Sequence, residues 1–298
     1  AVGENDVALH IRRGDFLKPE NAGLIRTVGL DYYLNGLDYI RQRQTIGTVY
    51  IFSDDFAAIE KEIEEKMKPL CVVLSGAGIS AESGIPTYRA EDGLWAGHKI
   101  EEVCTPEALQ RNRKKVLDFY NERRRNCSAA QPNAAHKALV ELEQGYNVQI
   151  ITQNVDDLHE RAGSANVLHL HGELNKARSG FDPDYIVPCF GEQSVDDKDP
   201  NGHPMRPHIV FFGENVPMLE PAIDLVSQAD VVLVIGTSLQ VYPANGLVNE
   251  AARNAEIYLI DPNPNTGFIP RPVETVKMKA GEGVPKVVAE LLEKVKNI

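Results

Sequence analysis

The sequence predicts an α/β protein: a Rossmann-like parallel sheet with helices on both faces and a small inserted subdomain, preceded by a short extra α/β fragment. Three observations predict this class. Short apolar runs alternate with segments of helical periodicity through most of the 298 residues. The run at 71–75 leads directly into a glycine-rich turn. A stretch rich in Gly, Pro and Asp at 177–207 interrupts the alternation, and we expect a loop or a small irregular subdomain there.

The first 66 residues have the pattern of one α/β unit. The spacing of apolar and β-branched residues predicts, in order, a strand at 7–11, a helix at 30–42, a strand at 48–52 and a helix at 57–67. This unit supplies only two strands. We therefore expect its sheet to be marginal unless it packs on another surface.

A second and longer α/β pattern follows the charge run at 60–66. We expect a parallel sheet covered on both faces, because several of its strands are continuous apolar runs. The predicted strands are 71–75, 148–152, 167–170, 208–212, 231–235 and 257–260. The predicted helices are 106–126, 134–144, 220–228, 243–253 and 284–295.

Met67 marks the expected boundary between two domains, residues 1–66 and residues 67–298. The sequence from Met67 reads MKPLCVVLSGAG, which is how a separate protein would start shortly before its first strand. We therefore expect a fusion, in which a complete domain follows an N-terminal extension. The alternative is that Met67 is an ordinary helix residue.

The charge balance argues against a general attraction to nucleic acid or anionic lipid. The chain carries 31 Lys and Arg against 43 Asp and Glu, a net charge of −12, so such a partner would need a local basic patch. We find no apolar run near the ~18 residues that span a bilayer and no signal-peptide pattern, and we expect a cytoplasmic protein. The four cysteines lack C-x-x-C spacing, which predicts neither a zinc knuckle nor a disulfide framework.

The glycine-rich turn has the pattern G-x-G-x-x-A, at Gly76, Gly78 and Ala81. Small residues there let the backbone approach a pyrophosphate at a helix N-terminus, but the pattern alone is a weak signal. A dehydrogenase would also carry an acidic residue at the end of a second strand about 20 positions later. The next predicted strand starts near residue 148, so hydride transfer is disfavoured.

Five separated motifs give this turn its context. They read GAGISAESGIPTYR at 76–89, TQNVD at 152–156, HLHGE at 169–173, IVFFGE at 209–214 and GTS at 236–238. In this order they resemble the sirtuins, the NAD-dependent protein lysine deacylases, and the resemblance covers residues 67–298. It implies an NAD cofactor, acylated lysine side chains of proteins as substrates, and release of nicotinamide and O-acyl-ADP-ribose.

The resemblance also implies the site residues. The catalytic residues would be His171, Asn154 and Asp156, the last two also binding the cofactor. The other cofactor residues would be Gly76, Ala77, Gly78, Glu82, Thr87, Tyr88, Arg89, Trp95, Gln153, Gly236, Thr237, Ser238, Asp261, Asn263 and Ala280. The substrate residues would be Tyr120, Arg123, Val210, Phe211, Gly213 and Glu214.

Chemistry supports several of these roles, and simpler explanations exist for two of them. An imidazole pKa near 6.5 suits His171 as a general base on a ribose hydroxyl, although a histidine there is more often structural when taken without the family. The polar run 153–156 follows a strand, where an open α/β sheet binds its ligands. An Asx turn with a helix cap would explain the same letters. Tyr88 and Arg89 match a loop that closes over NAD in sirtuins and would exclude water.

Three further positions follow from the resemblance. Asp261 stands where sirtuins often carry Asn for the adenosine ribose, and its carboxylate could still accept a ribose hydroxyl. Ala280 falls where a backbone contact to adenine is expected. Residues 210–214 resemble the edge segment that pairs with the substrate peptide by strand addition, in which backbone hydrogen bonds supply the affinity.

Tyr120 and Arg123 bear on the identity of the acyl group. At a spacing of i, i+3 they share a helical face. They resemble the Y-x-x-R of sirtuins that remove malonyl, succinyl or glutaryl groups, in which the guanidinium binds the acyl carboxylate. We therefore expect desuccinylase or demalonylase activity beside deacetylation. The alternative is that Arg123 belongs to a solvated run, 123–125, at a helix end.

The chain departs from the family at the structural zinc. Sirtuins commonly hold zinc through two cysteine pairs between the third and fourth motifs, and this chain has only Cys189 in that interval. No metal is expected. The segment 177–207 would then be held by local packing and turns.

The N-terminal part carries motifs of its own, HIRRGD at 10–15 and SDD at 53–55. Together these resemble α-1,2-fucosyltransferases, whose arginines bind the diphosphate of GDP-fucose; a surface turn with an Arg–Asp pair is the simpler explanation of the first motif. Only 66 residues match and the acceptor half is missing, so we expect an inactive remnant. A fucosyltransferase and a non-catalytic NAD or ADP-ribose binding module are the alternatives to a deacylase.

Overall fold

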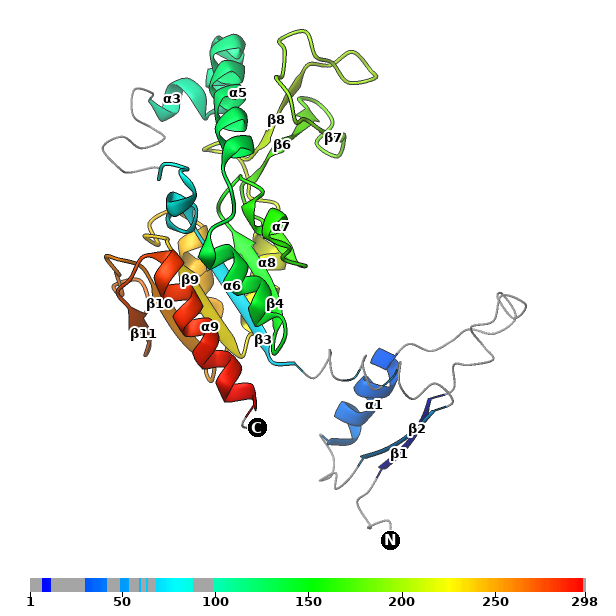
Figure 1. Cartoon of the computed structure of the whole chain (residues 1–298). Helices are drawn as coiled ribbons and strands as arrows, with labels where there is room; N and C mark the ends of the chain where they lie inside the picture. The colour runs from blue at the N-terminus through cyan, green and yellow to red at the C-terminus, as the bar shows by residue number, and fades with distance from the viewer. Residues whose placement is uncertain are drawn as a thin grey trace, which may run out of the picture. The chain divides into compact units, whose positions relative to one another are not determined.

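The computed structural model describes residues 7–11, 30–41, 49–53, 59, 63, 68–87 and 99–296 (Figure 1). Every structural statement below concerns these residues. The chain divides into two compact units, residues 1–68 and 69–298, and each is described by itself.

The first unit contains two parallel strands and one helix. Strands β1 (Val7–Ile11) and β2 (Val49–Ser53) pair with Val7 opposite Val49, and helix α1 spans Leu30–Arg41. Ile11, Leu30 and Ile59 are buried together as a small core. The predicted strands and first helix are confirmed. The predicted helix at 57–67 lies largely outside the described residues.

The second unit is built on a six-stranded parallel sheet in the order β11-β10-β9-β3-β4-β5. Its strands are β3 (Leu70–Ser75), β4 (Asn147–Thr152), β5 (Val167–His169), β9 (Val231–Ile235), β10 (Glu256–Ile260) and β11 (Glu274–Val276). All five residues of β9 are buried, because successive side chains point into opposite hydrophobic layers. The predicted parallel sheet is confirmed, and β11 was not predicted.

Helices cover both faces of this sheet, as predicted. Helices α6 (Ala134–Leu142) and α9 (Ala280–Lys296) lie side by side on one face (Figure 1). Helix α8 (Leu219–Ser227) and the 3-10 helix η4 (Ala244–Glu250) pack in the layer on the other face. A helix had been expected over 243–253, so there the helical segment is shorter and tighter than predicted.

A single helix predicted at 106–126 is two helices in the structure. Helix α4 (Pro106–Arg111) ends at Asn112, and α5 (Arg113–Ala129) begins after it. The Asn112 side chain accepts a hydrogen bond from the backbone N–H of Lys115 at 3.1 Å, which caps the start of α5. Apolar periodicity continues across the break, because both helices bury their apolar side chains in one cluster with α3 (Ile100–Val103).

The stretch at 172–209 forms a small antiparallel sheet of three strands in the order β7-β6-β8. These are β6 (Gly172–Ser179), β7 (Ile186–Pro188) and β8 (Met205–Ile209). The prediction of a small subdomain at 177–207 is confirmed, although strands β6 and β7 were not predicted. The predicted strand at 208–212 is wrong beyond Ile209, because the Glu214 carboxylate takes the Phe211 N–H and replaces the ladder hydrogen bond.

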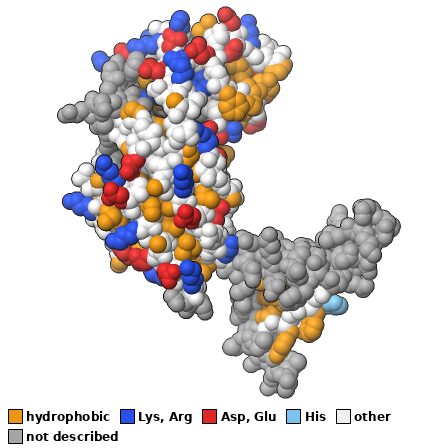
Figure 2. Space-filling model, in the orientation of Figure 1, with side chains coloured by type: hydrophobic (Ala, Val, Ile, Leu, Met, Phe, Trp, Pro, Cys, Tyr) orange, Lys and Arg blue, Asp and Glu red, His pale blue; other side chains and the backbone are white. Residues whose placement is uncertain are grey.

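The described helices include none that is long and apolar enough to cross a membrane. Figure 2 shows acidic and basic side chains interspersed over the visible face of the second unit. Neither observation tests the predicted cytoplasmic location, which stays a prediction.

Candidate functional site

The polar motifs meet at the carboxyl edge of the parallel sheet. Strand β3 pairs with β4 on one side and with β9 on the other. Strands that follow β3 in the sequence therefore lie on both sides of it, and the strand order reverses at β3. A parallel sheet opens a crevice where its strand order reverses in this way. The turn at 76–78 follows β3, residues 153–156 follow β4, and residues 236–238 follow β9.

Glycine is required in two of these turns because their backbones touch. The Gly78 N–H donates to the Gly236 carbonyl at 2.8 Å, and the Gly76 N–H donates to the Ile235 carbonyl at 3.0 Å. A Cβ on Gly78 would lie 2.6 Å from the Gly236 Cα. The small residues of the motif therefore allow the turns after β3 and β9 to contact each other. They also leave backbone exposed on the side where a ligand would bind.

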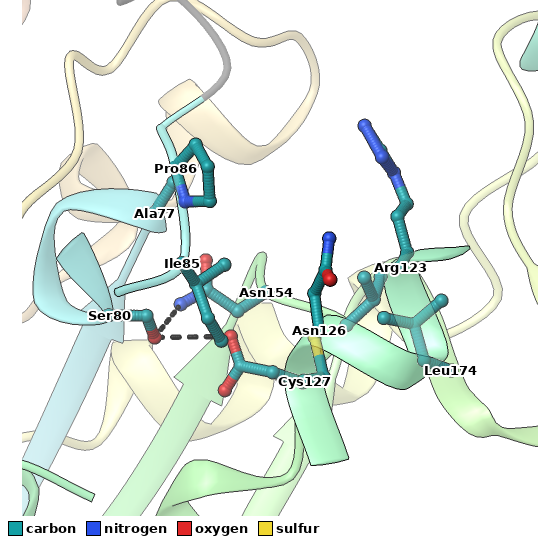
Figure 3. A pocket seen from close by; sticks show the side chains of 11 residues that line it. Ala77, Ser80, Ile85, Pro86, Arg123, Asn126, Cys127, Asn154 and Leu174 are labelled. Atoms are coloured by element: carbon teal, nitrogen blue, oxygen red, sulfur yellow. Dashed lines mark hydrogen bonds between the residues drawn. The ribbon is translucent and has the colours of Figure 1, made fainter. Parts of the chain in front are cut away.

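Ser80 joins the two polar residues that were predicted to be catalytic beside His171. Its hydroxyl donates to the Asp156 carboxylate at 3.1 Å and accepts from the Asn154 amide at 3.1 Å, as the dashed lines in Figure 3 show. The Asn154 amide also reaches the Gly76 carbonyl at 3.2 Å. Burial raises the pKa of Asp156, and its hydrogen bonds from Leu158 and Ser80 oppose that shift. The predicted Asx turn is also present, since Asp156 accepts from the Leu158 N–H.

His171 is oriented by the loop that follows β4. Its Nδ1 lies 3.1 Å from the Gln153 carbonyl oxygen. A carbonyl can only accept, so Nδ1 carries the proton and Nε2 keeps its lone pair. Burial lowers the pKa of His171, and the hydrogen bond to Gln153 partly opposes this. The ring is therefore neutral near pH 7, which is the form that accepts a proton.

Backbone N–H groups of the segment 210–214 donate hydrogen bonds within the protein. The Val210 N–H donates to the His171 carbonyl, and the Phe212 N–H donates to the Cys104 carbonyl. Glu214 turns inward, where its carboxylate accepts from the guanidinium groups of Arg206 and Arg178. Burial raises the pKa of Glu214, but the hydrogen bonds from Arg206 and Phe211 and the charges of Arg206 and Arg178 together outweigh it, and the net shift is downward. Its charge is thus balanced within the small subdomain.

Tyr120 and Arg123 are both buried on α5. The Tyr120 hydroxyl donates to the Cys104 thiol at 3.1 Å, and its ring stacks on Phe211 with centroids 5.8 Å apart. The Arg123 guanidinium lies 3.7 Å from the centroid of the Phe119 ring. Arg123 is 7% exposed, so the alternative that it belongs to a solvated run is wrong; only Arg125 of that run is exposed.

The far end of the site lies after β10 and at the start of α9. The Asp261 carboxylate accepts from the Asn263 N–H at 2.8 Å in an Asx turn. The Glu82 carboxylate accepts from the Gly281 N–H at 2.7 Å, which satisfies a free donor in the first turn of α9. Thr237 binds the Gln153 amide at 3.2 Å and thereby links the turn after β9 to the loop after β4.

One cavity joins most of the predicted residues. Asp156 lines a smaller neighbouring cavity with Ser80, Arg123 and Asn154 (Figure 3). Tyr88, Arg89 and Trp95 lie outside the described residues. The predicted residues lining the main cavity are Gly76, Ala77, Gly78, Glu82, Thr87, Tyr120, Arg123, Gln153, Asn154, His171, Val210, Phe211, Gly213, Glu214, Gly236, Thr237, Ser238, Asp261, Asn263 and Ala280.

About half of the residues lining the main cavity were not predicted, and among the unpredicted residues of the two cavities Ser80, Cys104 and Lys279 carry reactive or polar groups. Ser80 was passed over as a variable position of the glycine turn, although a hydroxyl two residues after Gly78 was visible in the sequence. Cys104 and Lys279 also line the main cavity. Lys279 directly precedes α9 and the predicted residue Ala280, and its charge beside that position was the available signal.

A model described as the Sir2 family matches residues 76–243, which is more than half of the chain. The chain belongs to the Sir2 family. The match contains the five motifs used for the sequence resemblance, so the predicted family is confirmed.

Curated relatives of this Sir2 protein are similar over nearly their full length. An NAD-dependent protein deacylase of Aggregatibacter actinomycetemcomitans is 88% identical over 204 residues, covering 68% of this chain and 98% of the relative. An NAD-dependent protein deacylase of Helicobacter pylori is 51% identical over 222 residues, covering 74% of this chain and 97% of the relative.

Solved Sir2 structures share the fold. An ADP-ribose complex of a mutant Sir2 homologue has a TM-score of 0.70 and 38% identity, covering 80% of this chain and 98% of that one. A Sir2 homolog–NAD complex has a TM-score of 0.68 and 38% identity, covering 79% and 94%.

The N-terminal unit has a separate similarity. A model described as glycosyl transferase family 11 matches residues 3–82. The predicted resemblance of this part to a glycosyltransferase is confirmed. The match runs past residue 66 into the glycine turn, so the two family matches overlap at residues 76–82.

Proposed function

We propose that this Sir2-family chain is an NAD-dependent protein deacylase whose acyl substrates include groups that end in a carboxylate. The activity is that of its named relatives. The acyl preference is supported by Arg123, a buried cation that lines the same cavity as His171. The acylated lysine side chains of proteins are the proposed substrates; one related Sir2 mutant structure contains a deacetylated peptide and an acetyl ADP-ribose.

The cavity fits a dinucleotide. It runs from the touching turns at 76–78 and 236–238, past Gln153 and Asn154, to His171. The absence of side chains on the glycines leaves backbone as the wall at its centre. Bound NAD would supply an electrophilic ribose carbon there.

Residues of the chain itself account for the proton transfer from the ribose and for the position of the reacting groups. His171 Nε2 points its lone pair away from the Gln153 carbonyl, and we assign it as the base that takes a proton from a ribose hydroxyl. The Asn154 amide is fixed by Ser80 and the Gly76 carbonyl, which positions it beside the sugar without rearrangement. Cys104, Tyr120 and Phe211 pack together and supply an apolar wall for the lysine side chain.

The first prediction tests both the activity and the acyl group. We expect nicotinamide release that depends on an acyl-lysine peptide, active in the wild type and silent in His171→Ala. In Arg123→Met, we expect kcat/KM for a succinyl-lysine peptide to fall about 10- to 100-fold, because a charge-assisted hydrogen bond contributes ~1.5–3 kcal/mol. The value for an acetyl-lysine peptide should change much less.

Arg125→Met is the matched control, because Arg125 lies on the same helix and pairs with Glu192 at the exposed surface. It should leave both values unchanged. Equal losses for the two peptides in Arg123→Met would show that Arg123 supports folding rather than acyl recognition. Activity that survives in His171→Ala would contradict the mechanism.

The remaining expectations are also proposals. We propose that the functional boundary lies at Met67 and that residues 1–66 are a fused remnant without GDP-fucose turnover. Two family matches support this proposal: the glycosyltransferase match is short, and the Sir2 match contains His171.

A further inference from the structure

His169 ends strand β5 beside the catalytic loop at 153–156, and among the described residues it lies outside the cavity lining. Its imidazole is 7% exposed. Nδ1 lies 3.0 Å from the Asn154 carbonyl oxygen, and Nε2 lies 2.7 Å from a carboxylate oxygen of Glu160 on α7 (Leu158–Ala162). Both ring nitrogens are therefore engaged.

These partners fix the charge of the ring. A carbonyl and a carboxylate can only accept hydrogen bonds, so both nitrogens of His169 must donate. The ring is then an imidazolium paired with Glu160. Burial lowers the pKa of His169, but the hydrogen bond and charge of Glu160 outweigh it, and the net shift is upward. Burial raises the pKa of Glu160, but the hydrogen bond and charge of His169, together with smaller contributions that include the charge of Lys176, outweigh it, and the net shift is downward.

The segment 169–174 holds three consecutive carbonyls of the catalytic loop. His171 Nδ1 donates to the Gln153 carbonyl, and His169 Nδ1 donates to the Asn154 carbonyl. The Leu174 N–H donates to the Val155 carbonyl at 2.8 Å. Of these three, the His169 bond depends on a titrating group away from the cavity. The Asn154 side chain leaves the backbone between the Gln153 and Asn154 carbonyls, so the bonds from His171 and His169 flank it.

The other charges around His169 form a closed set. Glu173 on β6 pairs with Lys176 at 2.7 Å, and Glu160 pairs with His169. Asp156 and the neutral His159 also face this ring. Glu160, His169 and Glu173 lie within 4.8 Å of one another, but the imidazolium and the ammonium already balance the two carboxylates. The cluster therefore has the charges of an ion network.

We propose that the His169–Glu160 ion pair positions the catalytic loop: the imidazolium holds the Asn154 carbonyl and, through it, the Asn154 amide and the Gln153 carbonyl that orients His171. His169 is a positioning residue, since it touches neither cavity. The inference rests on the proposed deacylase function and adds a pH dependence to it. Activity should rise as His171 loses its proton and fall when His169 loses its own.

The test is the pH profile of kcat for acyl-peptide-dependent nicotinamide release. The wild-type profile should have an alkaline limb, where kcat falls as His169 loses its proton. Glu160→Gln should move that limb to lower pH, because a neutral amide stabilises the imidazolium less than a carboxylate does. At a pH between the two alkaline limbs, where His169 is protonated in wild type but not in Glu160→Gln, the variant's kcat should be about 10- to 100-fold below wild type, as expected for a displaced catalytic group. His169→Gln should have a low kcat and no alkaline limb. The acid limb from His171 should stay in place in both variants, and KM for the peptide should change little.

Glu173→Gln is the matched control, because it removes one carboxylate from the same cluster without breaking the bond to His169. Its alkaline limb should shift less than that of Glu160→Gln. Equal shifts in the two variants, or no shift in Glu160→Gln, would overturn the proposal. Activity that is lost with a chelator and restored by zinc would also overturn it, since Glu160, His169 and Glu173 would then be ligands.

A second measurement separates this inference from the proposed function. Nitrogen-15 spectra of the histidine rings, with His169 assigned by its loss in His169→Gln, should show both nitrogens protonated at neutral pH and earlier deprotonation in Glu160→Gln. A silent wild-type enzyme would refute the deacylase function whatever the spectra show. An active wild type with a neutral His169 would refute this inference alone.

Discussion

His136 and His159 illustrate, at the residue scale, how burial decides which imidazoles carry charge. Both rings are almost fully buried, with centroids 4.9 Å apart. His159 Nε2 lies 3.0 Å from the Ser75 hydroxyl at the end of β3, and His136 Nδ1 accepts from the Asn133 N–H. Burial lowers the pKa of His136 to about 4 and lowers that of His159 well below its usual value. Within the described part of the chain, neither has the carboxylate partner that keeps His169 charged.

These two histidines predict that the second unit loses stability in acid. The unfolded chain binds their protons near pH 6.5 and the folded chain does not, so the free energy of unfolding falls as pH drops from 6.5 toward 4. For His136 the loss is about 2 kcal/mol between pH 7 and pH 5. Urea unfolding followed by circular dichroism at the two pH values measures it.

The variant His136→Gln should show a smaller loss between these pH values than wild type. His10→Gln is the control, because His10 is exposed in the first unit and should leave the difference unchanged. An identical pH dependence in wild type and His136→Gln would contradict the assignment.

At the scale of an element, Gly172 controls the start of strand β6, directly after His171, the proposed catalytic base. Its φ is +85°, and an added Cβ would lie 2.0 Å from the His208 carbonyl oxygen on β8. We predict that Gly172→Ala costs at least about 3 kcal/mol of unfolding free energy, because the strained backbone and the clash add. Thermal or urea unfolding measures the loss, and nicotinamide release should fall with it.

Gly191→Ala is the matched control for that substitution. A Cβ at Gly191 meets nothing within 4 Å, so the change should be within about 0.5 kcal/mol. A Gly172→Ala variant as stable as Gly191→Ala would show that β6 and β8 separate easily at this end.

Element boundaries were the part of the fold that sequence periodicity predicted least well. The pattern over 106–126 is helical throughout, yet Asn112 caps a new helix because its amide side chain satisfies a free backbone donor. The apolar run at 208–212 has strand character, yet pairing stops at Ile209, and Glu214, held by Arg206, binds the Phe211 N–H instead. In both places a polar side chain that apolar periodicity does not report on decides the backbone hydrogen bonds.

The whole chain consists of two compact units, and this predicts that the N-terminal one is dispensable for deacylation. Every predicted site residue belongs to the second unit. A chain that begins at Met67 should have the same kcat/KM for NAD and acyl peptide as the full chain. Nicotinamide release measured on both proteins, with circular dichroism to check folding, tests this.

The truncated chain carrying His171→Ala is the negative control for that comparison. A folded truncated chain that has lost activity would contradict the proposed boundary at Met67. GDP-fucose hydrolysis or transfer by the full chain would contradict the proposal that the first 66 residues are a remnant.

Sequence alone determined the family, the parallel sheet and about half of the residues that line the main cavity. It could do so because apolar runs report burial locally, and because five motifs in order carry information that no single glycine turn has. It could not determine which polar groups share a proton or a charge. Ser80 between Asn154 and Asp156, Glu160 against His169 and Glu214 against Arg206 are pairs from different elements. Only the tertiary structure decides such pairs, because hydrogen bonds and ion pairs require the two groups to lie about 3 Å apart. The separation of two residues along the sequence does not determine that distance.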